Sequence, residues 1–415
     1  MVMEFNTKLL HGRTVSGYAD HAILPQIAQV TAFSYESAQA QEKVFAHQAG
    51  GFAYTRIGNP TIAAFEQRMA ELEGGATATA CASGMAAITM GLLNFLRAGD
   101  EIIAANGLYG GTIDLFSDFE KLGIHVRFVE NLIPEEINKY TNTHTKAIYG
   151  EFISNPGLRV LDLPKLSEYA HEIGVPLVID STTVTPYVAN PLKLGADIVI
   201  HSTSKYVNGS GNSISGIIID GGRFPWDTDR YPALCEFKKY GRMCYSARLR
   251  SDLWENFGGC LAPMNAYLNI LGLETLGLRM ERINHNATAL AAALSKIPGV
   301  SVRHPSLLEH EDANLVKEEL QGQGGGIITL RVGSKEKAFE VINSLRLATI
   351  ASNIGDIRTL VIHPASTIFA KNTREAREKA GVYEDTIRIS VGIEDVGDLI
   401  ADFTQAIGSI MERLA

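Results

Sequence analysis

The chain has 415 residues, of which 46% are hydrophobic and 20% are charged, and its formal net charge at pH 7 is -9. This length is enough for two domains with a large core, and the acidic balance offers no basic surface for nucleic acid. We find no segment of about 18 uninterrupted apolar residues, no charged-then-apolar leader, and no metal-ligand spacing among the histidines. The four cysteines are widely spaced, which favours free thiols in a reducing cytoplasm.

The first 58 residues are predicted to form an arm. Residues 23–27 and 30–33 have an extended pattern, and no long periodic helix occurs there. A helix is expected to begin at Pro60, which suits a first helical position, and to end at Gly74. Its apolar residues recur at helical spacing, namely at Ile62, Phe65, Met69 and Leu72.

Residues 59–262 are predicted to form a large α/β domain. Short apolar strands alternate with helical stretches such as 112–122 and 164–173, which favours a mainly parallel sheet sandwiched by helices. Ligands of such sheets bind at the carboxyl ends of the strands. The expected strands are residues 101–105, 126–129, 145–149, 176–180, 198–201 and 215–219.

Residues 263–415 are predicted to form a smaller α+β domain. A boundary falls near Pro263, and residues 265–296 are expected to form one long helix. The rest of this part mixes helices with strands, expected at residues 326–330 and 386–391.

Lys205 lies just after the fifth expected strand. Residues with hydroxyl side chains precede it, and a glycine-rich loop follows it. In a partly desolvated pocket, a lysine amine loses its charge more easily and becomes a nucleophile toward aldehydes. Ser202 and Ser204 are placed to hold a phosphate beside it. An aldehyde with a phosphate suggests pyridoxal 5'-phosphate, although a solvated surface lysine is the alternative.

Asp180 ends the fourth expected strand, one strand–helix–strand step before Lys205. An ionised carboxylate there can keep a pyridine nitrogen protonated, so that the ring acts as an electron sink. The alternative is a helix cap, because Ser181 and Thr182 follow.

Two further loops are candidates for binding a cofactor. Ser83, Gly84 and Met85 form a small-residue turn into an apolar helix, and such a helix start can bind an anion. Tyr109, on a glycine-rich loop, can stack on a planar cofactor. An ordinary cap at Ser83 and a loop aromatic that packs on a neighbour remain alternatives.

Two arginines are candidates for anion binding. Arg56, close to Tyr54, has a planar fork suited to phosphate or carboxylate, although a surface arginine is the alternative. Arg388 lies inside an apolar strand, where it is either a carboxylate clamp or a residue of a half-exposed strand.

Together these residues resemble the γ-family of pyridoxal-phosphate enzymes of cysteine and methionine metabolism. The resemblance runs nearly from end to end through six ordered motifs. They are Tyr54-Thr55-Arg56, Ser83-Gly84-Met85-Ala86-Ala87, Asp180-Ser181-Thr182, His201-Ser202-Thr203-Ser204-Lys205-Tyr206, His363-Pro364-Ala365 and Arg388-Ile389-Ser390-Val391-Gly392. The family often has Asp-Asn-Thr in place of the third motif, but its aspartate is intact here.

The resemblance implies a pyridoxal-phosphate-dependent transferase fold, like that of aspartate aminotransferase, with a sheet of the seven-stranded type. It implies that Lys205 binds the cofactor covalently and then moves protons, that Asp180 pairs with the pyridine nitrogen and that Tyr109 stacks on the ring. The phosphate would be held by Ser83, Gly84, Met85, Ser202 and Ser204, the α-carboxylate of the substrate by Arg388, and cofactor or substrate by Asn155 and Asn353.

The resemblance also implies an oligomer, usually a tetramer built from dimers. In this family the residues matching Tyr54 and Arg56 reach the phosphate of a neighbouring subunit. Tyr54 is also expected to contact the substrate. The active site would then be complete only in the oligomer.

Two places separate members of the family. Methionine γ-lyases resembling this chain have a cysteine where Gly111 stands here, and residues 352–367 are similar to O-acetylhomoserine sulfhydrylases. We therefore expect replacement of the acyl group of an O-acylhomoserine by sulfide, or by sulfur from a carrier protein, to give homocysteine for methionine biosynthesis. A cystathionine γ-synthase, or a cystathionine or methionine γ-lyase, is the alternative.

A cofactor-binding protein without catalysis belongs to a different class, and it would be expected to lack Lys205, Asp180 or Arg388. A nicotinamide dehydrogenase is disfavoured because no strand leads into a Gly-x-Gly-x-x-Gly turn. The acyl group of the ester and the sulfur donor both stay open at this point.

Overall fold

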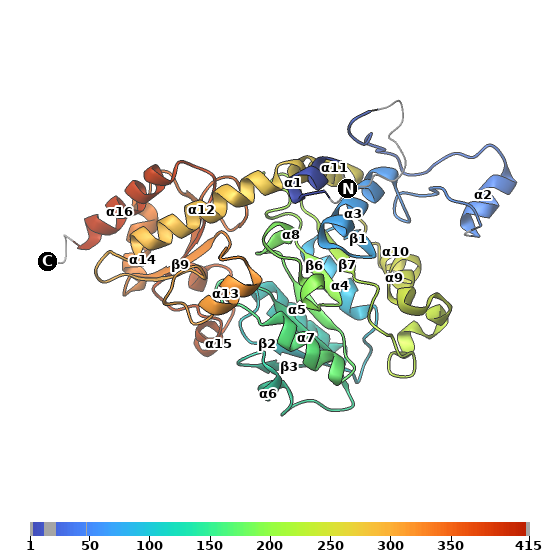
Figure 1. Ribbon diagram of the computed structural model, residues 1–415, viewed down its shortest axis with the longest axis horizontal. Coiled ribbons are helices and arrows are strands. Elements are labelled where there is room, and N and C mark those ends of the chain that lie inside the picture. Colours follow the sequence, from blue (N-terminus) through green and yellow to red (C-terminus); the bar gives the residue numbers. More distant parts are fainter. Residues whose placement is uncertain (1–2, 12–21, 47, 412–415) are drawn as a thin grey trace.

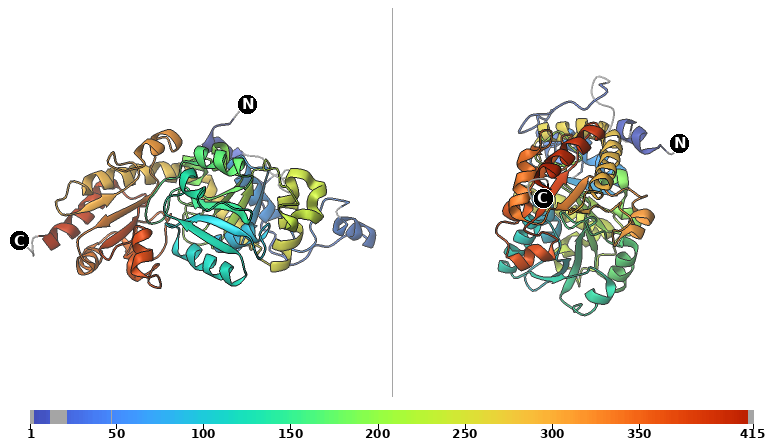
Figure 2. Two further views of the ribbon diagram at one scale, coloured as in Figure 1. Left: turned by 90° about the horizontal axis from the view of Figure 1, so that it is seen from below. Right: turned by 90° about the vertical axis from the view of Figure 1, so that its left-hand side faces the viewer.

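The computed structural model describes residues 3–11, 22–46 and 48–411. A large α/β part holds the centre of the molecule, and the helix α12 leads from it to a smaller part that carries the C-terminus (Figure 1). Seen along a perpendicular direction, the two parts lie side by side along the longest axis (Figure 2). The predicted combination of a helix-covered sheet with a smaller C-terminal α+β unit is confirmed.

The large sheet has seven strands in the order β1-β7-β6-β5-β4-β2-β3. Six of them run in the same direction, whereas β7 runs the opposite way and pairs antiparallel with both β1 and β6. Sequence analysis missed β1, which fills the edge beside β7. The strands are β1 Thr77–Cys81, β2 Glu101–Ala105, β3 His125–Val129, β4 Thr145–Glu151, β5 Leu177–Asp180, β6 Ile198–His201 and β7 Gly216–Asp220.

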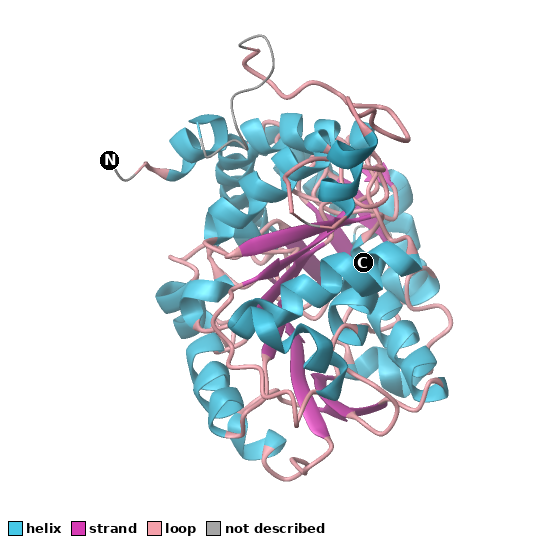
Figure 3. Ribbon diagram, turned by 90° about the vertical axis from the view of Figure 1, so that its right-hand side faces the viewer, coloured by secondary structure: helices cyan, strands magenta, loops and turns pink. Residues whose placement is uncertain are grey.

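Both faces of this sheet are buried, which is why its strands are nearly continuous apolar runs. Ile148 and Ile179 face one core and Tyr149 and Val178 the other, as the alternation of strand side chains requires. Helices on the two sides are visible around the strands in Figure 3. The helices of this part are α3 Pro60–Glu73, α4 Gly84–Leu93, α5 Gly110–Lys121, α6 Pro134–Ile137, α7 Leu163–Glu172, α8 Thr185–Val188, α9 Cys244–Arg248 and α10 Trp254–Phe257, with 3-10 turns at Pro191–Leu194 and Pro232–Met243 and a π turn at Leu249–Leu253.

The smaller part is built on a five-stranded sheet in the order β10-β11-β12-β9-β8. Its own core lies between this sheet and the helices α12, α14 and α16. The strands are β8 Ser301–Arg303, β9 Ile327–Arg331, β10 Thr349–Ile350, β11 Leu360–Ile362 and β12 Thr386–Ser390. α11 Pro263–Glu274 still packs on α3 of the large part. The helices that follow it are α12 Leu276–Leu294, α13 Ala313–Glu319, α14 Lys335–Ser344, α15 Arg374–Lys379 and α16 Val396–Met411, with a 3-10 turn at Pro364–Ser366.

The single long helix expected at residues 265–296 is wrong, because the chain breaks at Thr275 into α11 and α12. The break allows a close approach to the loop that follows Lys205. A side chain at Gly272 would come within 2.5 Å of the carbonyl oxygens of that loop. Arg279 donates hydrogen bonds to the carbonyl oxygens of Tyr206 at 2.6 Å and of Gly272 at 2.7 Å.

The N-terminal arm contains two short helices, α1 Phe5–His11 and α2 Ala38–Phe45. Leu9 of α1 is buried in the core of the large part, whereas α2 buries none of its residues. Figures 1 and 2 show α2 far from the body of the molecule. No helix within the described ranges is long and apolar enough to cross a membrane.

A buried pair connects the end of α3 to the strand that leads to Lys205. His201 Nε2 and Glu73 Oε1 lie 2.7 Å apart, and both side chains are almost completely buried. Burying a carboxylate costs free energy, which a hydrogen-bonded partner offsets. Removing one member of the pair leaves the other buried without that partner.

We therefore expect the substitution Glu73→Ala to lower the free energy of unfolding by about 3 kcal/mol. Urea denaturation of the purified protein measures this change. The exposed Glu172→Ala is the control and should change stability by less than about 0.5 kcal/mol. Equal stability of the two variants would contradict a structural role for the pair.

Candidate active site

A cavity of about 430 Å³ lies at the carboxyl ends of the large sheet's parallel strands, where the small domain covers them. It collects every predicted site residue except Tyr54 and Arg56. These are Ser83, Gly84, Met85, Tyr109, Asn155, Asp180, Ser202, Ser204, Lys205, Asn353 and Arg388. Segments more than 300 residues apart in the sequence therefore meet in one place.

Lys205 is partly buried in this cavity and is not a solvated surface lysine. Its Nζ donates a hydrogen bond to Asn353 Oδ1 at 2.6 Å. Burial, and then the positive charge of Arg388, lower the pKa of Lys205 to about 8. A much larger fraction of this amine is therefore neutral near pH 7 than for a lysine in water, as a nucleophile requires.

Arg388 lies on β12 with only 3% of its surface exposed. Its Nη1 donates to Asn155 Oδ1 at 3.4 Å and its Nη2 to the carbonyl oxygen of Asn353 at 3.0 Å, while its Nε is buried without a partner. Among the described residues it has no carboxylate partner. A buried guanidinium with a free donor fits the carboxylate of a small ligand.

Asp180 ends β5, and its Oδ1 accepts the backbone N–H of Thr182 at 2.9 Å. This bond closes a turn at the end of the strand. The next helix, α8, begins only at Thr185 after Val184, so the helix-cap interpretation is wrong. Burial raises the pKa of Asp180. A protonated pyridine nitrogen supplies the positive partner that such a buried carboxylate lacks.

The turn at the start of α4 fits a phosphate. Ser83 caps the helix by accepting the N–H of Ala86 at 3.1 Å, which leaves the first backbone N–H groups, those of Gly84 and Met85, pointing outward. A side chain at Gly84 would lie 2.6 Å from Ser202 Cβ, so glycine lets the turn approach the Lys205 loop. The Ser202 hydroxyl makes no hydrogen bond within the described part of the chain and can donate to an anion.

Ser204 also lines the cavity, but its hydroxyl is already engaged. It donates to the carbonyl oxygen of Ser215 at 2.9 Å and accepts the N–H of the same residue at 2.8 Å. In this arrangement Ser204 braces the loop, and Ser202 has the available proton.

Tyr109 stands at the start of α5 with 39% of its surface exposed. Its backbone N–H donates to Glu151 Oε1 at 2.5 Å. Its ring covers the space beside Gly111, where an added Cβ would lie 2.6 Å from Tyr109 Cε1.

Tyr54 and Arg56 do not line the cavity. The Cζ of Arg56 lies 5.5 Å from the centroid of the Tyr54 ring, and its Nη1 donates to the carbonyl oxygen of Glu255 at 2.7 Å. Among the described residues it has no acidic partner.

Sequence analysis missed Glu151 and Thr182, which also line the cavity. Thr182 Oγ1 accepts the N–H of Ser202 at 2.8 Å and so ties the Asp180 loop to the Lys205 loop. The signal for Glu151 was available, because a carboxylate follows the apolar run of β4 as Asp180 follows that of β5.

The cavity thus brings together an amine, a carboxylate and a helix start that can bind an anion, which are the kinds of group that an aldehyde, a pyridine nitrogen and a phosphate require. The sequence profile of the family described as Cys/Met metabolism PLP-dependent enzyme matches residues 6–408. An O-acetyl-L-homoserine sulfhydrylase of Leptospira meyeri is 39% identical over 92% of this chain and 91% of its own. A homocysteine synthase of Schizosaccharomyces pombe is 38% identical over 97% of this chain and 98% of its own.

A solved structure agrees with these sequences. The crystal structure of a putative O-acetylhomoserine (thiol)-lyase from Campylobacter jejuni superimposes with a TM-score of 0.91 at 33% identity. The match covers 98% of this chain and 100% of that one. That crystal structure contains N'-pyridoxyl-lysine-5'-monophosphate.

The low pKa of Lys205 leads to a test. In Arg388→Met the neighbouring positive charge is gone, so the pKa of Lys205 should rise from about 8 toward the ordinary value of 10.5. The rate at which the apoenzyme captures pyridoxal 5'-phosphate depends on the neutral amine, and its pH profile should move to higher pH. The exposed Arg346→Met is the control, and an unmoved profile in Arg388→Met would contradict the assignment.

Proposed function

The chain belongs to the Cys/Met metabolism PLP-dependent enzymes, and on that premise we propose that it replaces the acetyl group of O-acetylhomoserine by sulfide. The products are homocysteine and acetate. The observation that carries the proposal is the buried, carboxylate-free Arg388 beside Lys205, since it provides a clamp for an amino-acid carboxylate next to a nucleophilic amine. The names of the relatives support the acetyl ester and sulfide as substrates.

Bound pyridoxal 5'-phosphate supplies the electron sink for chemistry at the substrate's α-carbon. The N–H groups of Gly84 and Met85 and the Ser202 hydroxyl would hold its phosphate, and Asp180 would keep the proton on its ring nitrogen. Tyr109 would cover the ring, and Asn155 would contact either the cofactor or the substrate. Asp180 ends β5, Ser202 follows β6, and Gly84 and Tyr109 lie at the starts of α4 and α5.

The remaining steps belong to the chain's own side chains. Arg388 binds the α-carboxylate and fixes the α-carbon near Lys205. Once the substrate amine has displaced it from the cofactor, Lys205 Nζ removes the α-proton and returns it later. A proton then leaves the β-carbon and the bond from Cγ to the acetate oxygen breaks. Sulfide forms a bond to Cγ, and the β-carbon regains a proton before Lys205 returns the proton to the α-carbon. Asn353 accepts hydrogen bonds from both Lys205 and Arg388, so it fixes the position of the base relative to the guanidinium that binds the carboxylate.

The space beside Gly111 supports replacement over elimination. The Tyr109 ring occupies the position that a side chain at residue 111 would take. A cysteine there, as in methionine γ-lyases, would displace this ring from its present place. A cystathionine γ-synthase or γ-lyase has no comparable observation in its favour. The four free cysteines support a reducing, cytoplasmic location.

The proposed function predicts that purified holoenzyme converts O-acetyl-L-homoserine and sulfide into homocysteine. Turnover with O-succinylhomoserine, and with cysteine or a protein thiocarboxylate as sulfur donor, should be much slower. Chromatographic quantification of homocysteine, or of cystathionine where cysteine is the nucleophile, measures all combinations, and Lys205→Ala is the inactive control. Cleavage of cystathionine without use of O-acetylhomoserine would overturn the proposal.

We further propose that the active site is completed by a second copy of the chain, in a tetramer built from dimers. The projecting arm supports this, because it exposes Ile23, Val30 and Phe45 and holds Arg56 outside its own cavity. Arg56 would then bind the phosphate in the neighbouring subunit, and Tyr54 would lie beside it.

Co-expression of two inactive variants tests the exchange of residues. Arg56→Ala and Lys205→Ala each lack one part of the site, but a hybrid dimer contains one site in which both parts are intact. We expect activity in the mixture that neither variant has alone, measured as homocysteine formation. If Arg56 acted within its own subunit, the mixture would stay inactive.

A further inference from the structure

Glu151 is the last residue of β4, and Asp180 is the last residue of the neighbouring strand β5. Both therefore lie at the carboxyl ends of the parallel strands, where they are paired in register. Only 7% of the surface of Glu151 is exposed. Its Oε1 accepts the N–H of Tyr109 at 2.5 Å, and its Oε2 accepts the N–H of Asn155 at 3.1 Å. Among the described residues it forms no ion pair, so backbone N–H groups are its principal polar partners.

These two N–H groups belong to separate loops of the site. Tyr109 ends the loop that leads from β2 into α5, and Asn155 lies in the loop that follows β4. One carboxylate therefore sets the spacing between the residue that faces the cofactor ring and the residue that contacts Arg388. Because each oxygen serves one loop, a group with a single acceptor oxygen cannot hold both loops.

A continuous chain of hydrogen bonds runs from Glu151 to Lys205. Asn155, held by Glu151, accepts Arg388 Nη1 at 3.4 Å through its side-chain oxygen. Arg388 Nη2 donates to the carbonyl oxygen of Asn353 at 3.0 Å, and Asn353 Oδ1 accepts Lys205 Nζ at 2.6 Å. A displacement of Asn155 is thus transmitted to the carboxylate clamp and then to the amine.

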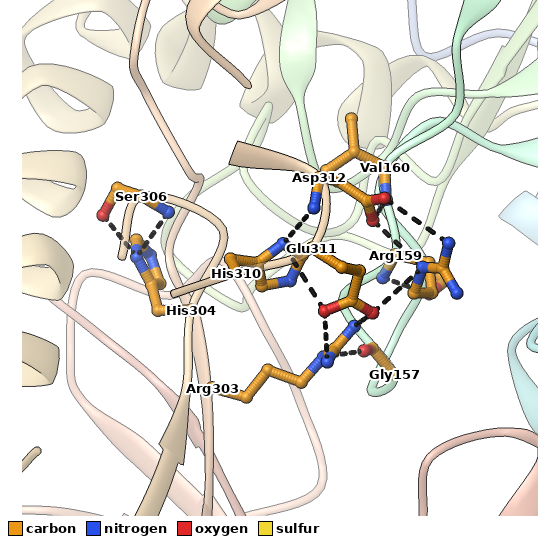
Figure 4. A network of polar contacts seen from close by, with 10 residues as sticks. Gly157, Arg159, Val160, Arg303, His304, Ser306, His310, Glu311 and Asp312 are labelled. Atoms are coloured by element: carbon orange, nitrogen blue, oxygen red, sulfur yellow. Dashed lines mark hydrogen bonds and ion pairs between the residues drawn. The ribbon is translucent and has the colours of Figure 1, made fainter. Parts of the chain in front are cut away.

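Glu151 also separates two cavities, and no other described residue lines both. Beyond it lies a polar cleft of about 1030 Å³ between the domains. On that side, the loop after Asn155 is fixed to the small domain, as Figure 4 shows: Arg303 Nε donates to the carbonyl oxygen of Gly157 at 2.6 Å, and Asp312 accepts the N–H of Val160 at 2.9 Å. The loop is thus anchored from outside by the small domain and from inside by Glu151.

The electrostatic setting agrees with a positioning role. Burial, and then the charge of Asp180, raise the pKa of Glu151 to about 8, although the two N–H groups act against this. The two N–H groups donate to both carboxylate oxygens and so favour the ionised form, in which both oxygens accept.

We propose that Glu151 is a positioning residue for the reaction, which fixes the Tyr109 and Asn155 loops so that Arg388 and Lys205 meet the substrate in register. The inference rests on the proposed function for the identity of that substrate. It predicts that loss of the second acceptor oxygen weakens recognition of the amino-acid carboxylate, whatever its effect on stability.

The test compares Glu151→Gln with Glu101→Gln. Glu101 is a matched control because it is also a buried glutamate at the end of a strand. It is the first residue of β2, at the amino ends of the parallel strands, and it accepts hydrogen bonds from Asn142 and Thr145. Binding of L-homoserine to each holoenzyme is followed through the visible absorbance of the bound cofactor. Steady-state kinetics with O-acetyl-L-homoserine and sulfide, and thermal unfolding, are measured on the same samples.

We expect Glu151→Gln to weaken L-homoserine binding and to lower kcat/KM by about tenfold, as the loss of one buried hydrogen bond implies. KM for the ester should rise, whereas the control should keep its KM even if its stability falls. Unchanged binding and KM in Glu151→Gln, or losses that only follow the folded fraction, would overturn the inference. If wild-type enzyme made no homocysteine, the proposed function would fail, and the L-homoserine titration would still decide the role of Glu151.

Discussion

The active site depends on two cationic side chains that share one asparagine. Lys205 from the large domain donates to the Asn353 side chain, and Arg388 from the small domain donates to the Asn353 carbonyl oxygen. Neither has a carboxylate partner among the described residues, and burying such groups costs free energy. The lysine responds by losing its proton more easily, and the arginine keeps a free donor for an anion. The cavity therefore favours an anionic ligand at Arg388 and an electrophile that can react with the amine of Lys205.

The parts of the site that lie on adjacent strands could be predicted from the sequence. Asp180 and Lys205 follow apolar runs one strand–helix–strand step apart, and parallel neighbours place their carboxyl ends at one edge. The contact of Lys205 with Asn353 spans 148 residues, and no local pattern announces it. Arg388 stands out locally as an arginine inside an apolar strand, but no local pattern shows that it shares Asn353 with Lys205. Only the family resemblance brought these distant residues together before the structure did.

The remaining departures have local physical causes. β1 was missed because its alanines and threonines carry little strand pattern, and it is held by pairing with β7. The helix break at Thr275 accompanies a close backbone approach at Gly272, which periodicity cannot show. Ser204 turned inward because Ser215 offers it both a donor and an acceptor. Glu151 was overlooked because a glutamate at a strand end is usually solvated.

The covalent attachment of the cofactor to Lys205 is the central claim, and one measurement tests it most directly. Holoenzyme is reduced with borohydride, which fixes the cofactor to the amine that carries it, and is then digested and analysed by mass spectrometry. We predict a phosphopyridoxyl group on the peptide that contains Lys205 and on no other lysine. A modified lysine elsewhere, or an unmodified Lys205 in fully loaded enzyme, would contradict the account.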